Sequence, residues 1–207
     1  MSDDINGQIL SGSAFSEALK NIMSTHRPSS ILEIGTWKGL GSTKRIIDNI
    51  IELNLNTSFI SVECNEEFYN IAKSNLKDFS NYVSLLYGRV IKISDIIKFL
   101  RSNPIEFDDQ YRWLLEDVQN AEQCPYIIDQ IPDKIDLLLL DGGEFSTYAE
   151  WQMLKNRSKV IILDDVNVMK CRQIKKEVIS NPNEYKILYE SNERHGSMAV
   201  LRLLNDK

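Results

Sequence analysis

Five short apolar runs that alternate with helical patterns constrain this chain more than any other feature. They are SSILEIG (29–35), TSFISVE (57–63), VSLLYG (83–88), IDLLLLD (135–141) and KVIILDD (159–165). The runs are mostly apolar throughout, which is typical of strands in a parallel sheet that is covered on both faces. Segments with apolar residues at helical spacing lie between them. The sequence therefore predicts an α/β fold with a doubly wound, mostly parallel sheet.

Two later runs, YKILYES (185–191) and SMAVLRLL (197–204), extend the predicted sheet to seven strands. Only the loop NERHG separates them, and a loop this short suits an antiparallel pair rather than a crossover. We therefore expect an antiparallel last strand. A helix is expected at about residues 13–25, within an N-terminal helical segment 1–28. The length of 207 residues fits a single domain, 1–207, with a full-sized core.

Residues 101–133 form an acidic insertion that precedes the predicted fourth strand and interrupts the alternation of strands and helices. This segment holds eight acidic residues against two arginines, which equals the net charge of −6 of the whole chain. It contains an amphipathic helix whose predicted apolar face is Tyr111, Leu114, Leu115, Val118 and Ala121. The helix could pack on the domain surface, cover a site as a lid, or contact a second subunit in a homodimer.

The charge and composition exclude several classes of partner. No basic stripe is present that would neutralise phosphates, so we do not expect a nucleic-acid partner. No apolar run approaches the roughly 20 residues of a membrane helix, so we expect no membrane association. Three widely spaced cysteines without a CxxC pair, together with two histidines, argue against a zinc site or a disulfide framework. A cytoplasmic location is the natural expectation.

The first strand runs into a glycine turn, ILEIGTWKGLGST (31–43). In a doubly wound sheet, ligands bind outside the carboxyl ends of the strands, where the strand order reverses. The spacing of Gly35, Gly39 and Gly41 differs from the G-x-G-x-x-G that seats a pyrophosphate. Glu33 would repel a diphosphate but would suit a cationic ligand. Glu63, at the end of the second strand, can accept hydrogen bonds from two ribose hydroxyls.

An adenosine with a positive charge in place of phosphates fits this pattern, and S-adenosylmethionine has both features. The alternative is a tight turn that binds nothing. LEIGTWKGLGS resembles motif I of the class I S-adenosylmethionine-dependent methyltransferases, E/D-x-G-x-x-x-G. YGRV, IDLLLLDGG and KVIILDDVN resemble the regions around their third, fourth and fifth strands. The resemblance covers about residues 30–204 and implies a Rossmann-like methyltransferase fold. It implies these cofactor-binding residues: Glu33, Gly35, Thr36, Gly39, Ser42, Glu63, Cys64, Gly88, Arg89 and Asp141.

Three aspartates end neighbouring strands of the predicted sheet. Asp141 ends the fourth strand, and Asp164 and Asp165 end the fifth. Three carboxylates at one edge repel one another unless they are protonated or bound to a cation, and no lysine or arginine adjoins them in sequence. Oxygen-only ligands suit Mg²⁺. The competing interpretation is that Asp165 caps a helix and Asp141 touches only the cofactor.

The aspartates also resemble the metal ligands of the catechol and caffeoyl-CoA type O-methyltransferases and of the macrolide-sugar O-methyltransferases. The resemblance implies metal ligation by Asp141, Asp164 and Asp165. The catechol type has a lysine three residues after the first metal ligand, where this chain has Glu144. The expected catalytic residues are therefore Asp141 with Glu144 or His195 as the general base.

The predicted function is S-adenosylmethionine-dependent methylation of a hydroxyl on a small molecule or sugar, with Mg²⁺ as a candidate second cofactor. Two alternatives come from other classes. The first is a nucleotide-binding oxidoreductase, which the glycine spacing disfavours. The second is a non-catalytic protein that keeps the methyltransferase fold.

Overall fold

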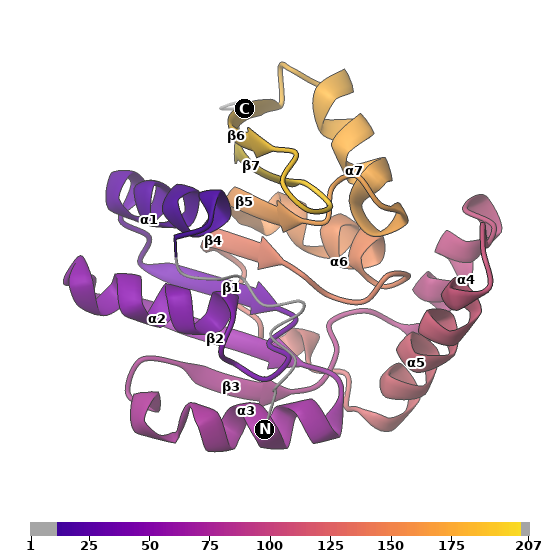
Figure 1. Ribbon diagram of the computed structural model, residues 1–207, viewed down its shortest axis with the longest axis horizontal. Helices are drawn as coiled ribbons and strands as arrows, with labels where there is room; N and C mark the ends of the chain where they lie inside the picture. Colours follow the sequence, from indigo (N-terminus) through magenta and orange to yellow (C-terminus); the bar gives the residue numbers. More distant parts are fainter. Residues whose placement is uncertain (1–11, 204–207) are drawn as a thin grey trace.

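The computed structural model describes residues 12–203, which form one seven-stranded sheet between two layers of helices (Figure 1). The strands are β1 Ser30–Ile34, β2 Ser58–Glu63, β3 Ser84–Tyr87, β4 Ile135–Leu140, β5 Ser158–Asp164, β6 Tyr185–Ser191 and β7 Ser197–Arg202. The helices are α1 Ala14–His26, α2 Ser42–Glu52, α3 Glu66–Asn75, α4 Ile93–Ser102, α5 Asp109–Gln123, α6 Thr147–Leu154 and α7 Met169–Ser180. Short 3₁₀ turns occur at Lys77–Phe79, Ile128–Gln130 and Lys155–Arg157. No helix among residues 12–203 is both long and apolar enough to cross a membrane.

The strand order is β3-β2-β1-β4-β5-β7-β6. Strands β1 to β5 pair in parallel, and β7 pairs antiparallel to both β5 and β6. This confirms the predicted doubly wound sheet with an antiparallel last strand. The strand order reverses between β1 and β4, so their carboxyl ends border the crevice where such sheets bind ligands. In Figure 1 the arrows of β1, β4 and β5 point toward the side of the molecule on which α4 and α5 lie.

Each face of the sheet has its own apolar core, because successive residues of a strand point to opposite faces. Leu32 and Ile34 of β1 belong to the core that contains side chains of α4, α5, α6 and α7. Ile31, next to Leu32, packs in the other core, with α1 and α2. Burial on both faces explains why the five parallel strands are apolar throughout rather than alternating.

Local capping fixes where several of these helices begin. The Ser13 side chain accepts a hydrogen bond from the backbone N–H of Ser16 at the start of α1, at 3.2 Å. The Asn65 side chain accepts one from the N–H of Phe68 at the start of α3, at 3.0 Å. Each cap satisfies an otherwise unpaired N–H of the first turn. Because Asn65 comes two residues after Glu63, its cap also fixes the course of the chain beside the end of β2.

The acidic insertion contains α5, as predicted, and the predicted apolar face of that helix is confirmed in part. Ala121 belongs to the core, and Leu114 and Val118 pack against it. Tyr111 and Leu115, in contrast, are 59% and 68% exposed.

The inward side of α5 also carries Asp117 and Asn120, which line a cavity at the carboxyl ends of the strands, called the main cavity below. A helix that forms part of the wall of a polar cavity does not need a continuous apolar stripe, so the hydrophobic pattern identified only part of its inner face.

Candidate functional site

The glycine turn after β1 brings the backbone of β1 against the end of β4. Gly35 has φ +96°, and a Cβ added there would lie 2.1 Å from the backbone oxygen of Asp141. Only glycine fits this contact. Trp37 follows with φ 50°, in the left-handed region, and lines the main cavity. The turn is therefore shaped for a close approach of two strand ends beside a cavity.

Glu33 lies beneath this turn and is fully buried. It accepts hydrogen bonds from Ser42 Oγ at 2.5 Å, Thr43 Oγ1 at 2.7 Å and Ser61 Oγ at 2.6 Å. Burial raises the pKa of Glu33 to about 7, although these hydroxyl groups oppose the shift. The expectation that Glu33 faces a cationic ligand is wrong, because its carboxylate connects β1, β2 and the start of α2 instead.

Three other expected cofactor residues also lie outside the cavity wall. Thr36 is buried, and its hydroxyl is 2.5 Å from that of Ser61. Gly39 has φ +78° and packs against Leu76, so it shapes the turn. The hydroxyl of Ser42 is directed to Glu33. These residues stabilise the turn and do not line the cavity beside it.

The main cavity lies at the carboxyl ends of the strands and has a volume of about 360 Å³. Six of the expected cofactor residues line it: Gly35, Glu63, Cys64, Gly88, Arg89 and Asp141. An apolar part of the wall comes from Ile34, Val62, Val90, Ile91 and Ile96. The cavity thus combines an apolar compartment with a few acidic groups, which is the usual composition of a small-molecule site.

Glu63 is held rigidly at the edge of this cavity. Its Oε2 accepts a hydrogen bond from the N–H of Trp37 at 2.7 Å, and its Oε1 accepts one from the N–H of Asn65 at 2.8 Å. Burial raises the pKa of Glu63, against these backbone hydrogen bonds. Each carboxylate oxygen has a further lone pair, so Glu63 can still accept two hydrogen bonds from a ligand.

Arg89 and Cys64 contribute to the wall in different ways. The Arg89 guanidinium donates a hydrogen bond to the backbone oxygen of Cys124, and its backbone pairs with Tyr126. Arg89 therefore fastens the segment after α5 to the end of β3. Burial raises the pKa of the Cys64 thiol well above its usual range. Cys64 consequently acts as an apolar wall group and not as a nucleophile.

Two carboxyl groups in the cavity wall are not evident from the sequence. Asp117 Oδ2 accepts a hydrogen bond from the N–H of Phe145 at 2.7 Å, and burial raises the pKa of Asp117 to about 6. Burial raises the pKa of Glu150 to about 8, and its Oε2 has no hydrogen-bond partner within residues 12–203. Glu150 lies against Gly142 and Asp117 lies against Gly143, and a Cβ added at either glycine would clash with its neighbouring carboxyl group. The GG pair after Asp141 was the only signal of this close packing.

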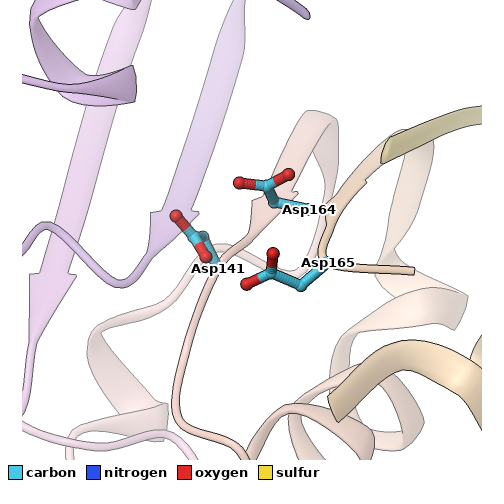
Figure 2. A group of neighbouring side chains, drawn as sticks. All are labelled: Asp141, Asp164 and Asp165. Atoms are coloured by element: carbon cyan, nitrogen blue, oxygen red, sulfur yellow. The ribbon is translucent and has the colours of Figure 1, made fainter. Parts of the chain in front are cut away.

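The three predicted aspartates meet at the ends of β4 and β5 (Figure 2). One carboxylate oxygen from each of Asp141, Asp164 and Asp165 lies within 4.8 Å of the others. Asp165 has φ 57°, a left-handed conformation that is uncommon outside glycine. Burial, together with Asp141 and Asp165, raises the pKa of Asp164 to about 7. The predicted clustering is therefore confirmed.

Lys170, in the first turn of α7, is the group that sequence analysis missed. Its Nζ donates hydrogen bonds to Asp141 Oδ1 at 2.5 Å and to Asp165 Oδ2 at 3.0 Å. The side chain is only 7% exposed. Burial alone would lower the pKa of Lys170. Asp141 and Asp165 outweigh this effect and hold that pKa well above its usual range. No lysine or arginine adjoins the three aspartates in sequence, but the fold brings Lys170 into contact with two of them.

The two candidate general bases both lie near this cluster. His195 Nδ1 is 3.3 Å from Asp165 Oδ1, and the imidazole is 64% exposed. Its loop is tied to the β5–α7 connection, because Asn167 N–H donates to the His195 backbone oxygen at 2.9 Å. Neither His195 nor Glu144 is part of the cavity wall. Burial raises the pKa of Glu144, and the nearby Lys170 opposes this shift. His195 thus has a partner that orients its ring and an exposed face toward solvent.

No protein-family model matches the chain, and no curated protein matches it in sequence. Solved structures do match it. A provisionally assigned caffeoyl-CoA O-methyltransferase of Staphylococcus aureus has a TM-score of 0.65 at 16% identity, covering 97% of this chain and 88% of its own. An O-methyltransferase of Bacillus cereus in complex with SAH has a TM-score of 0.60 at 16% identity, with coverage of 96% and 85%.

The O-methyltransferase TomG of Streptomyces achromogenes, involved in tomaymycin synthesis and solved with SAM, has a TM-score of 0.59 at 13% identity. The match covers 95% of this chain and 82% of that one. At identities this low the likeness establishes the fold. The chain thus has the Rossmann-like methyltransferase fold that its sequence predicted.

Proposed function

We propose that this protein is an S-adenosylmethionine-dependent methyltransferase that acts on a hydroxyl group of a small molecule. The observation that carries the proposal is Glu63, a rigidly held carboxylate at the rim of a cavity between the glycine turn and the strand ends. It is suited to bind the two hydroxyls of a ribose. Two structures of the same fold contain SAH or SAM, which supports the same cofactor here.

The cavity suggests how each part of the cofactor is recognised. If the ribose is held by Glu63, Val90, Ile91 and Ile96 would form the apolar wall for the adenine ring. Gly35 and Asp141, at the switch point between β1 and β4, would then face the methionine end. The acidic groups there suit a sulfonium and an ammonium group, and they would repel the diphosphate of a dinucleotide.

The reaction is an in-line transfer from sulfur to oxygen. The acceptor oxygen forms a bond to the methyl carbon as the bond between that carbon and the sulfonium sulfur breaks, which leaves S-adenosylhomocysteine. His195 takes the hydroxyl proton, and Asp165 orients its ring and stabilises the imidazolium that forms. The protein contributes mainly by holding the two reacting atoms in contact.

The acidity of the site favours neutral or cationic acceptors such as a sugar or a small phenol. The three carboxylates of Asp141, Asp164 and Asp165 outnumber the nearby cations Lys170 and Arg194, so a phosphorylated acceptor would be repelled. Nucleic acid remains an unexpected substrate for the same reason. A cytoplasmic location and a homodimer remain predictions from the sequence.

Magnesium, the second predicted cofactor, has suitable donors in the three aspartates, since each offers a carboxylate oxygen. A bound ion would polarise the acceptor hydroxyl. Lys170 already contacts two of these carboxylates, so the mechanism above uses only groups of the chain.

Isothermal titration with S-adenosylhomocysteine and with NAD tests the proposal. We expect S-adenosylhomocysteine to bind and NAD not to bind. Glu63→Ala should weaken binding by roughly 1–3 kcal/mol, the usual loss for a charged hydrogen-bond partner. Glu67→Ala, an exposed acid on α3, is the matched control and should bind like the wild type. Binding of NAD alone, or equal affinity in the wild type and Glu63→Ala, would contradict the proposal.

A further inference from the structure

Lys170 occupies an unusual position for a lysine. It is buried in the first turn of α7, where the unpaired N–H groups of the helix favour negative charge. Lysine is almost never buried unless it is paired. Both features oppose an ammonium group here, so the position is stable only because Asp141 and Asp165 bind it directly.

The partner Asp165 is also held in an unfavourable conformation. Its φ of 57° places a non-glycine residue in the left-handed region, which costs free energy that the surroundings must supply. In this conformation one carboxylate oxygen contacts Lys170 Nζ at 3.0 Å and the other lies 3.3 Å from His195 Nδ1. The strained residue thus links the buried ammonium to the candidate base.

The ammonium group lies among the oxygens that would bind a metal ion. It bridges two of the three carboxylates whose oxygens lie within 4.8 Å of one another. A divalent ion bound at roughly 2.0–2.6 Å from the same oxygens could not share that space with Nζ. The donor types fit magnesium, but the arrangement with Lys170 does not.

We infer that Lys170 supplies the positive charge of this site in place of a divalent metal ion. The inference rests on the proposed function for its catalytic meaning. An ammonium group has three N–H donors, and two of them are used by Asp141 and Asp165. Lys170 also lines the cavity, so the third donor can hold the acceptor oxygen. Lys170 thereby positions both the acceptor and, through Asp165, His195.

Calorimetric titration with Mg²⁺ and with Ca²⁺, without cofactor or acceptor, tests this inference. We expect no saturable binding to the wild type. Lys170→Met removes the ammonium group that bridges Asp141 and Asp165 and should bind Ca²⁺ saturably, with a rise of several degrees in Tm on adding the ion. Adding Asp164→Asn to Lys170→Met should abolish that binding. Lys175→Met is the matched control on α7, because Lys175 pairs with Glu190 instead.

Saturable Mg²⁺ binding by the wild type that Asp164→Asn removes would overturn the inference. A folded Lys170→Met that binds neither ion would also overturn it, since the carboxylates would then not form a cation site. If Lys170→Met does not fold, the ion titrations of the wild type and of Lys170→Arg test the inference instead. We expect neither of these two proteins to bind Mg²⁺ or Ca²⁺. These ion titrations contain no S-adenosylmethionine. A failure of the proposed function would therefore appear only in the titration with S-adenosylhomocysteine, and it would not be confused with a failure of this inference.

Discussion

At the scale of single residues, Glu33 shows how a buried carboxylate can support a site without facing it. Three hydroxyl groups donate to it, from β2 and from the start of α2. Glu33→Ala leaves these donors buried without an acceptor, and we expect a loss of about 3 kcal/mol in the free energy of unfolding. Urea denaturation measures it. Glu33→Gln keeps one acceptor oxygen and should lose less; equal stability of Glu33→Ala and the wild type would refute the role.

His195 carries the second prediction at this scale. His195→Ala should lower kcat by roughly 10²–10⁴-fold, the usual contribution of a general base, and leave the affinity for S-adenosylhomocysteine unchanged. Single-turnover methyl transfer and calorimetry measure the two quantities. His26→Ala, at the end of α1, is the control and should retain full activity. If His195→Ala is active and Glu144→Gln is not, Glu144 is the base instead.

At the scale of elements, α5 is the part of the acidic insertion that closes the cavity. Ala121 is 5% exposed and lines the cavity, whereas Leu115 on the outer side is 68% exposed. Ala121→Leu should project into the space for the adenine and lower the affinity for S-adenosylhomocysteine at least about tenfold, which corresponds to roughly 1.4 kcal/mol. Leu115→Ser should change neither affinity nor stability by more than about 0.5 kcal/mol.

Both effects are measured by calorimetry and thermal unfolding. Unchanged affinity in Ala121→Leu would mean that the ligand does not reach α5. Reduced affinity in Leu115→Ser would mean that the outer side of the helix, rather than the inner side, faces the ligand.

The elements were largely predictable from the sequence, whereas the contacts across them were not. The seven strands and the meeting of Asp141, Asp164 and Asp165 follow from apolar runs and from the parallel arrangement of strand ends. Lys170 was missed because its position depends on how the β5–α7 loop turns at Asp165, a left-handed residue without a glycine to mark it. The polar part of the inner face of α5, Asp117 and Asn120, was missed because hydrophobic periodicity does not identify side chains that face a polar cavity.

At the scale of the whole molecule, buried carboxyl groups make stability depend on pH. Burial raises the pKa of Glu33 to about 7 and that of Glu150 to about 8, above their ordinary value of 4.5. Between pH 4.5 and these raised values, the folded protein binds more protons than the unfolded chain. The free energy of unfolding should therefore fall as the pH rises through this window. Groups with lowered pKa values, such as Asp165 and His26, act oppositely: Asp165 does so only in acid, near its ordinary pKa of 3.8, and His26 does so just below its ordinary pKa of 6.5.

Urea denaturation from about pH 5 to about pH 8 measures this dependence. Within its window each group should reduce the free energy of unfolding by up to about 1.4 kcal/mol per pH unit. Glu150→Gln should remove one group's share of the slope, whereas Glu67→Gln, exposed on α3, should leave it unchanged. Burial also raises the pKa of Asp117 to about 6 and that of Asp164 to about 7, so these groups add to the same slope. A free energy of unfolding that stays constant or rises over this range would contradict the raised pKa values of these carboxyl groups.

The place of β7 within the sheet has a consequence for protein synthesis. β7 follows every other strand along the chain, yet it lies between β5 and β6. It also follows the β6–β7 loop that carries His195 beside Asp165. While a nascent chain lacks Ser197–Arg202, the edge of β5 has no partner and the candidate base has no fixed position. An unfinished chain on the ribosome therefore lacks the strand that covers the edge of β5, and it cannot yet assemble the groups that would transfer the methyl.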